Sequence, residues 1–146
     1  MISDTKVVAI GGGTGLSTML KGLKLHTHNI TAVVTVADDG GSSGILRSDL
    51  GMLAPGDVRN CVSALAEVDP VMGELLNFRF KDGSLKGHSL GNLFLAALNE
   101  TSSSFDEAVK KFSHLAGVVG TVYPVTNESV TVSYTHLRAH ETDSYL

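Results

Sequence analysis

The feature that most constrains the fold is a short apolar run followed at once by a glycine-rich turn, Lys6-Val-Val-Ala-Ile10 and Gly11-Gly-Gly-Thr-Gly-Leu-Ser17. The β-branched run predicts a strand buried on both faces, and the residues after it carry so little side-chain bulk that the backbone can turn sharply. Apolar residues at helical spacing follow over residues 18–23. The turn therefore delivers free main-chain N–H groups to a helix N-terminus, where we expect a phosphate to bind.

The spacing of this turn excludes two well-known phosphate sites. The dinucleotide-binding fingerprint requires a third glycine where this chain has Leu16. The P-loop of ATP- and GTP-binding proteins requires a lysine beside its last glycine, and this turn contains none. The turn thus predicts a Rossmann-like βα unit whose phosphate site is of neither kind, and a tight turn that binds nothing is the alternative.

A second β-rich run, residues 30–36, sets the fold class. Two strands joined by one helix form a right-handed parallel crossover, so we predict an α/β fold, a Rossmann-like parallel sheet with helices on both faces. The loop after this run, residues 37–44, contains Asp38, Asp39 and several glycine and serine residues. It lies at the carboxyl edge of the sheet, where ligands bind in open parallel sheets.

Asp38 and Asp39 suggest two kinds of contact with a ligand. Asp38 follows the glycine turn by about 20 residues, a distance at which nucleotide-binding units place an acid for a ribose hydroxyl. With a bound diphosphate, one of the two acids, Asp38, could also contribute to a weak Mg²⁺ site. The alternative is that both acids only cap the next helix or form its preceding turn.

The segment Pro55-Gly-Asp-Val-Arg-Asn60 contains three further candidate residues, Asp57, Arg59 and Asn60. Asp57 is predicted to cap a helix that runs through Leu65. Arg59 falls in the first turn of that helix, where the helix dipole disfavours a cation unless an anion lies nearby. Arg59 is therefore a candidate phosphate ligand, with Asn60 beside it in the same turn, and a solvated surface arginine is the alternative.

The segment Gly87-His-Ser-Leu-Gly-Asn92 has two interpretations. It matches the G-x-S-x-G elbow of serine hydrolases, but the polar, turn-rich residues before it do not form the buried strand that this elbow follows. It also fits a helix start that contacts a ligand phosphate or hydroxyl, with His88 or Asn92 as polar donors, and a structural histidine is the alternative. A helix over residues 71–80 is predicted to contribute packing only.

Composition excludes other classes of protein. The 146 residues carry a net charge of −4, which gives no basic surface for nucleic acid, and they contain no apolar run long enough for a membrane span. Cys61 is the only cysteine and no leader peptide is evident, so a cytoplasmic location is expected.

We predict that residues 1–131 are the N-terminal part of one nucleotide-binding domain. Residues 132–146 resemble a translated sequencing adapter and are treated as a non-native tail.

Four motifs in order, residues 8–17, 36–44, 55–60 and 87–92, resemble those of the putative gluconeogenesis factor family (YvcK type). This family belongs to the 2-phospho-L-lactate transferase-like superfamily. The resemblance implies a bacterial regulator that binds a UDP-sugar, UDP-N-acetylglucosamine, and that is needed for gluconeogenic growth, normal cell shape and cell-wall synthesis. The related transferases use a GDP-activated phospholactyl donor and magnesium.

The motifs supply the residues that we expect to form the ligand pocket. The expected roles are phosphate binding by Gly12, Gly13, Thr14 and Gly15; ribose, metal or acceptor contacts by Asp38 and Asp39; charge by Asp57, Arg59 and Asn60; and polar contacts by His88, Ser89 and Asn92. The expected partner is a UDP-sugar or another nucleotide diphosphate, with Mg²⁺ as the cofactor to consider. The alternatives to a regulator are a transferase and, as a minor one, a hydrolase that uses Ser89. The sequence assigns no catalytic residue, and it leaves a homo-oligomer open.

Overall fold

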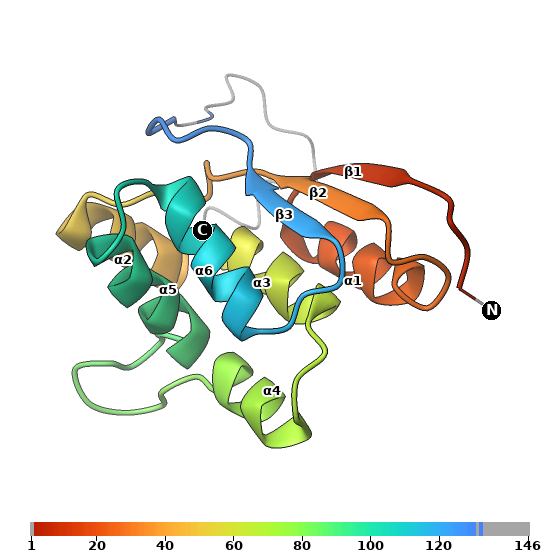
Figure 1. The fold of residues 1–146 in the computed structure, drawn as a ribbon. Coiled ribbons are helices and arrows are strands. Elements are labelled where there is room, and N and C mark those ends of the chain that lie inside the picture. The colour runs from red at the N-terminus through yellow and green to blue at the C-terminus, as the bar shows by residue number, and fades with distance from the viewer. Residues whose placement is uncertain (1, 131, 133–146) are drawn as a thin grey trace, which may run out of the picture.

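A computed structural model describes residues 2–130 and residue 132, so all but the first residue of the expected tail lies outside the described part. The strands are β1 (Val7–Gly11), β2 (Ile30–Val34) and β3 (Thr121–Pro124). They form a parallel sheet in the order β1-β2-β3, with Ala32 of β2 opposite Ala9 on one side and Val122 on the other. The predicted α/β fold with a parallel sheet is confirmed (Figure 1).

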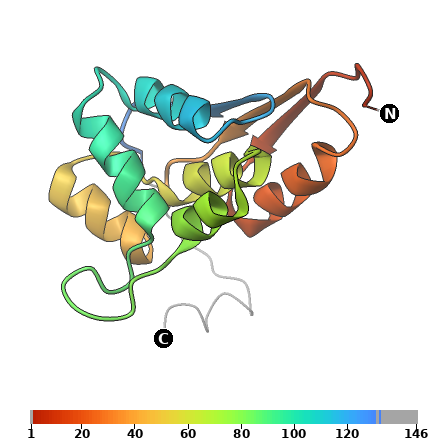
Figure 2. The same ribbon diagram turned by 60° about the horizontal axis from the view of Figure 1, so that its bottom comes forward.

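Six helices are described between these strands, and Figure 2 shows them from a second side. Their bounds are α1 Gly13–Leu23, α2 Gly41–Leu50, α3 Gly56–Leu65, α4 Pro70–Asn77, α5 Leu90–Glu100 and α6 Phe105–Leu115. The sequence explains several of their starts. The side chains of Asp69, Ser89 and Ser104 accept hydrogen bonds from main-chain N–H groups in the first turns of α4, α5 and α6.

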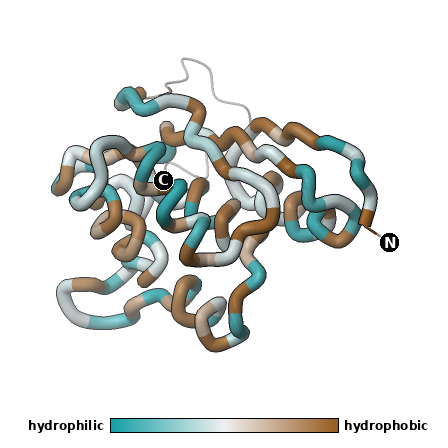
Figure 3. Tube along the Cα trace, viewed as in Figure 1, coloured by the Kyte–Doolittle hydropathy of each residue, from teal (hydrophilic) through white to brown (hydrophobic). Residues whose placement is uncertain are grey.

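The two faces of the sheet differ within the described residues. Figure 1 shows the helices on one side of the sheet. Ala9, Ala32 and Val122 are paired across the three strands and are all buried. On the opposite face Val8 is 66% exposed and Ile10 is 75% exposed, so the prediction that the first strand is buried on both faces is wrong. An apolar run cannot by itself reveal which face of a strand is covered. Figure 3 shows the apolar stretches that run along β1 and β2.

The core centres on α3, which packs against α1 and contacts strands β2 and β3. Val58, Cys61, Val62 and Leu65 of this helix are all fully buried. Burial also raises the pKa of the Cys61 thiol to about 12, so Cys61 packs in the core as an uncharged side chain. No helix in the described part of the chain has the length and apolar character to cross a membrane.

The segment after α3 departs from the sequence prediction. The helix expected over residues 71–80 ends at Asn77, and Leu76 is its only buried residue. Val71, Met72 and Leu75 are exposed, so the expected core face is wrong. The residues after Asn77 form an extended segment instead, with Arg79 paired to Ser89 in an isolated antiparallel bridge.

Candidate functional site

Three helices begin around one small cavity, which we call the helix-end cavity. Its volume is about 180 Å³. Residues from the starts of α2, α3 and α5 line it, together with the loop after β2. Five of the predicted site residues meet there, Asp38, Asp57, Arg59, Asn60 and Asn92, and Ser42, Ser43 and Arg79 join them.

Close backbone packing explains the glycines around this cavity. A Cβ at Gly44 would lie 2.1 Å from the carbonyl oxygen of Asp39, and one at Gly56 would lie 2.5 Å from the Ser43 hydroxyl. The Gly56 N–H donates a hydrogen bond of 3.0 Å to that hydroxyl. Glycine therefore lets the start of α3 pack directly against the start of α2.

Arg59 is the cation at the centre of the site, and only 7% of it is exposed. Its Nε donates to Asn92 Oδ1 at 3.3 Å, and its Nη1 donates to Asn77 Oδ1 at 2.9 Å. A Cβ at Gly91 would lie 2.8 Å from Arg59 Cδ, so the glycine makes room for the arginine stem. Burial lowers the pKa of Arg59, and the neighbouring charge of Arg79 lowers it further. An arginine stays protonated despite such a shift, so the site contains a buried positive charge held by neutral amides.

A chain of polar side chains extends behind Arg59. Asn92 Nδ2 donates to Ser42 Oγ at 3.1 Å, and Ser42 Oγ lies 2.8 Å from His88 Nδ1. His88 is buried, and its contact with Ser42 ties α2 to the segment before α5. These bonds fix the Asn92 side chain, which in turn orients the Arg59 guanidinium.

Ser89 is fully buried, and its hydroxyl accepts a hydrogen bond of 3.1 Å from the Asn92 main-chain N–H. A hydrolase nucleophile must instead be exposed and bonded to a histidine. The described His88 contact goes to Ser42 rather than to Ser89. Ser89 therefore acts as the cap of α5, and the structure does not support the hydrolase interpretation.

Asp57 contacts the glycine turn rather than capping its own helix. The N-cap of α3 is Pro55, and no side-chain cap bond is formed there, so the predicted cap is wrong. The Asp57 carboxylate instead lies beside the glycine turn, where the Gly13 main-chain N–H at the start of α1 favours its charged form. Burial raises the pKa of Asp57, the Gly13 N–H partly offsets this, and the charge of Asp38 raises it again.

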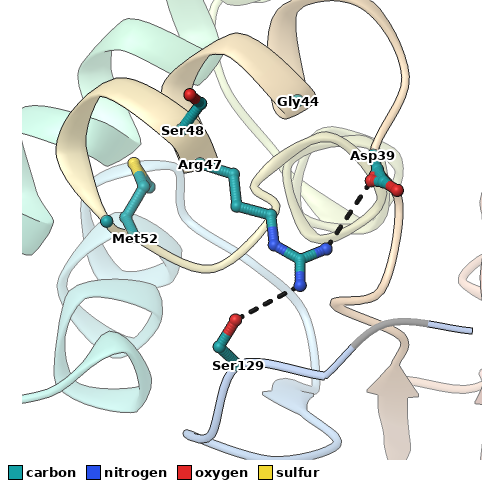
Figure 4. A pocket seen from close by; sticks show the side chains of 7 residues that line it. Asp39, Gly44, Arg47, Ser48, Met52 and Ser129 are labelled. Carbon is teal, nitrogen blue, oxygen red and sulfur yellow. Dashed lines mark hydrogen bonds and ion pairs between the residues drawn. The ribbon is translucent and has the colours of Figure 1, made fainter.

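The two adjacent acids of the loop after β2 point to different cavities. Asp38 lines the helix-end cavity, and its Oδ1 accepts a hydrogen bond from Gly40 N–H at 3.0 Å. Asp39 lies 3.7 Å from Arg47 Nη1, beside an open hollow of about 500 Å³ that Arg47 and Ser129 also line (Figure 4). Only Asp38 is therefore placed with the other candidate ligands.

The acids fit a magnesium site only together with a ligand. In the described part of the chain, no three histidine, cysteine or acidic side chains gather in a metal-binding group. Asp38 and Asp57 both line the helix-end cavity, and the charge of Asp38 raises the pKa of Asp57. Mg²⁺ is commonly held by one or two carboxylates with phosphate oxygens and water, so these two acids with a diphosphate would suit it.

Other predicted site residues lie outside the lining of the cavity. These are the glycine-turn residues Gly12, Gly13, Thr14 and Gly15, the buried pair His88 and Ser89, and Asp39. Arg79 and Asn77 were missed because their segment was interpreted as a packing helix. The alternation Phe78-Arg79-Phe80 was the available signal, since it is typical of an extended segment rather than a helix.

Comparisons with known proteins agree with this fold and its motifs. The sequence matches the family described as 2-phospho-L-lactate transferase CofD over residues 7–142. The "Putative gluconeogenesis factor" of Thermoanaerobacterium thermosulfurigenes is 65% identical over 129 residues, which cover 88% of this chain and 40% of that protein. The "Gluconeogenesis factor" of Bacillus subtilis is 50% identical over 128 residues, which cover 87% of this chain and 40% of that protein.

A solved structure shows the same architecture. The crystal structure of protein BH3568 from Bacillus halodurans matches with a TM-score of 0.82 and 49% identity, over 86% of this chain and 41% of that one. The chain thus spans 40% of the two curated relatives and 41% of the solved one. These findings confirm the resemblance carried by the four motifs. The chain belongs to the CofD family, and the relatives it matches there are gluconeogenesis factors.

Proposed function

We propose that this chain is the N-terminal part of a regulator that binds a sugar nucleotide of the UDP-N-acetylglucosamine type. In this proposal the regulator supports growth on gluconeogenic carbon sources and normal cell shape and wall synthesis. The family and its gluconeogenesis factor relatives support the cellular setting. The helix-end cavity supports the binding of a nucleotide diphosphate.

The buried guanidinium of Arg59 is the observation that carries the proposal. Its hydrogen-bond partners in the described residues are the neutral side chains of Asn77 and Asn92. A buried charge costs free energy unless an opposite charge compensates it, and a phosphate would supply that charge. The starts of α2, α3 and α5 add partial positive charge at the same place.

The size of the cavity limits which part of the ligand it can hold. Pockets that enclose a whole small molecule measure about 300–1,000 Å³, and the helix-end cavity measures about 180 Å³. The cavity therefore suits the diphosphate and part of a ribose. The base and sugar would contact other surfaces, which the longer relatives are large enough to provide.

A transferase is the second candidate, because the matched family is described by a transferase activity. It would use a donor activated by a nucleotide diphosphate. The same cavity would hold the diphosphate, with Asp38 and Asp57 near its Mg²⁺. The two candidates thus share a binding site and differ in turnover.

Calorimetry and product analysis on the full-length Bacillus subtilis relative separate the two candidates. We expect heat of binding with UDP-N-acetylglucosamine and no product after prolonged incubation with Mg²⁺. Turnover of a GDP-activated phospholactyl donor would show that the transferase function, and not the regulator function, is correct. Absence of binding to either nucleotide compound would refute both.

A further inference from the structure

We infer that the phosphate groups of the ligand bind between the guanidinium groups of Arg59 and Arg79, rather than on the main-chain amides of the glycine turn after β1. The inference rests on the proposed function for the identity of the whole ligand. Both arginines line the helix-end cavity. Arg79 is thereby assigned a role in ligand binding that its sequence context did not suggest.

The position of Arg79 is fixed by hydrogen bonds before any ligand binds. The N–H of Phe80 donates to the His88 carbonyl at 2.9 Å, and the N–H of Leu90 donates to the Phe78 carbonyl at 2.8 Å. These bonds hold the segment around Arg79 against the residues that precede α5. The Arg79 side chain in turn donates from Nη1 to the Gly87 carbonyl. A preorganised guanidinium loses less entropy when an anion binds.

Both guanidinium groups have neutral hydrogen-bond partners. The ion pairs recorded for residues 2–130 join Arg47 to Asp39, Lys110 to Asp106 and Lys111 to Glu107. Arg59 and Arg79 therefore face the same cavity as like charges without a carboxylate in contact. An oxyanion between them would relieve their repulsion, and the planar guanidinium groups match its geometry with paired N–H donors.

The glycine turn is a poorer place for the phosphate. The Asp57 carboxylate already lies beside this turn, and the Gly13 N–H lowers its pKa. A phosphate at this helix terminus would have to displace that carboxylate or lie beside it, against like-charge repulsion. Asp38 and Asp57 also line the helix-end cavity, so ligand hydroxyls or a cation would face these acids while the phosphate oxygens face the arginines.

The test is calorimetric titration of inorganic pyrophosphate into the 146-residue chain and its variants. We expect Arg79→Ala to weaken binding about tenfold or more, because a charge-assisted bond is lost. Arg79→Lys keeps the charge but loses the paired donors. Its affinity for pyrophosphate should therefore lie between that of the unmodified chain and that of Arg79→Ala. The control is Lys81→Ala, which removes an exposed cation outside the cavity and should leave the affinity unchanged. Thermal melts verify that each variant is folded.

Arg59→Lys is the second variant, because it keeps a buried cation while losing the bonds to Asn77 and Asn92. It should also weaken pyrophosphate binding about tenfold. Equal affinity of Arg79→Ala and the unmodified chain, or no pyrophosphate binding by the unmodified chain, would overturn the inference. The proposed function is judged separately. If a relative binds UDP-N-acetylglucosamine while Arg79→Ala has no effect here, only the arginine site fails; if pyrophosphate binds through Arg79 but no UDP-sugar binds, only the proposed function fails.

Discussion

The Asp57 carboxylate lies beside the start of α1, where the main-chain N–H of Gly13, the first residue of that helix, lowers its pKa. An acid of α3 thus lies at the positive end of another helix, the place at which an external anion would otherwise bind. The contact joins the glycine turn to the helix-end cavity, because Asp57 also lines that cavity.

The raised pKa of Asp57 gives a pH-dependent stability. The folded state binds the Asp57 proton more tightly than the unfolded state, whose pKa is near the ordinary value of 3.8. The free energy of unfolding should therefore decrease as the pH rises from about 4 through the folded-state pKa. Asp57→Asn removes this titration and keeps an oxygen that can accept from Gly13. Urea unfolding should show that the unmodified chain loses stability relative to Asp57→Asn as the pH rises across this range. If the difference in free energy of unfolding between the two chains is independent of pH, or changes in the opposite direction, the raised pKa of Asp57 is contradicted.

Gly12 should tolerate no side chain, because its turn packs on the loop after β2. A Cβ there would lie 2.1 Å from Thr35 Cγ2 and 3.0 Å from Asp57 Oδ2. Gly12→Ala should lower the free energy of unfolding by about 1–3 kcal/mol. Thr35→Ser removes the nearer methyl group and should recover part of this loss in the double variant, measured by urea unfolding.

Gly15 provides the matched control for this substitution. A Cβ at Gly15 would meet nothing within 4 Å, and Gly15 lies inside α1. Gly15→Ala should raise the free energy of unfolding by up to about 1 kcal/mol, because alanine is the better helix former. Equal destabilisation by Gly12→Ala and Gly15→Ala would show that the contact with Thr35 does not limit position 12.

Ser89 should matter for stability and not for hydrolysis. Its hydroxyl caps α5 through the Asn92 N–H, so Ser89→Ala should lower the free energy of unfolding by about 1 kcal/mol. Assays with a nitrophenyl ester should give the same background rate for the unmodified chain and the variant. Ester hydrolysis that disappears in Ser89→Ala would restore the hydrolase interpretation.

Ile10 should contribute more to association than to folding. Its side chain is 75% exposed on the face of the sheet opposite the described helices, near exposed Val8. Ile10→Thr should reduce dye binding and self-association in light scattering, with little change in stability. The control is Val34→Thr on the covered face, where the side chain is fully buried. Val34→Thr should lower the free energy of unfolding by about 1–3 kcal/mol. An equal decrease for Ile10→Thr would show that position 10 is buried in solution.

Much of the lining of the helix-end cavity could be predicted, because one rule of parallel sheets brings distant loops together. Asp38 follows β2, while Arg59 and Asn92 start helices, and these residues meet at the carboxyl edge of the sheet. The partners of individual side chains could not be predicted. Asp57 sits at a helix start in the sequence, yet its carboxylate reaches the neighbouring helix α1, since tertiary packing rather than local spacing sets its contact.

Other features depended on information that a pattern of residue types does not contain. The apolar residues of β1 look alike in sequence, but Ala9 is buried and Ile10 is exposed. Arg79 was missed because the apolar spacing of α4 continues past Asn77, where the helix ends. The alternation Phe78-Arg79-Phe80 indicates an extended segment, but it does not specify the bridge to Ser89 on which the place of Arg79 depends.

The most direct test of the central claim is an NMR titration of the ¹⁵N-labelled chain with the diphosphate of uridine. We expect the largest shifts at the amides of Gly41 and Asn60 and at the Nε–H signals of Arg59 and Arg79, because the diphosphate would enter the helix-end cavity. Shifts confined to Thr14 and Gly15, with the arginine signals unchanged, would contradict the account and place the phosphate on the glycine turn.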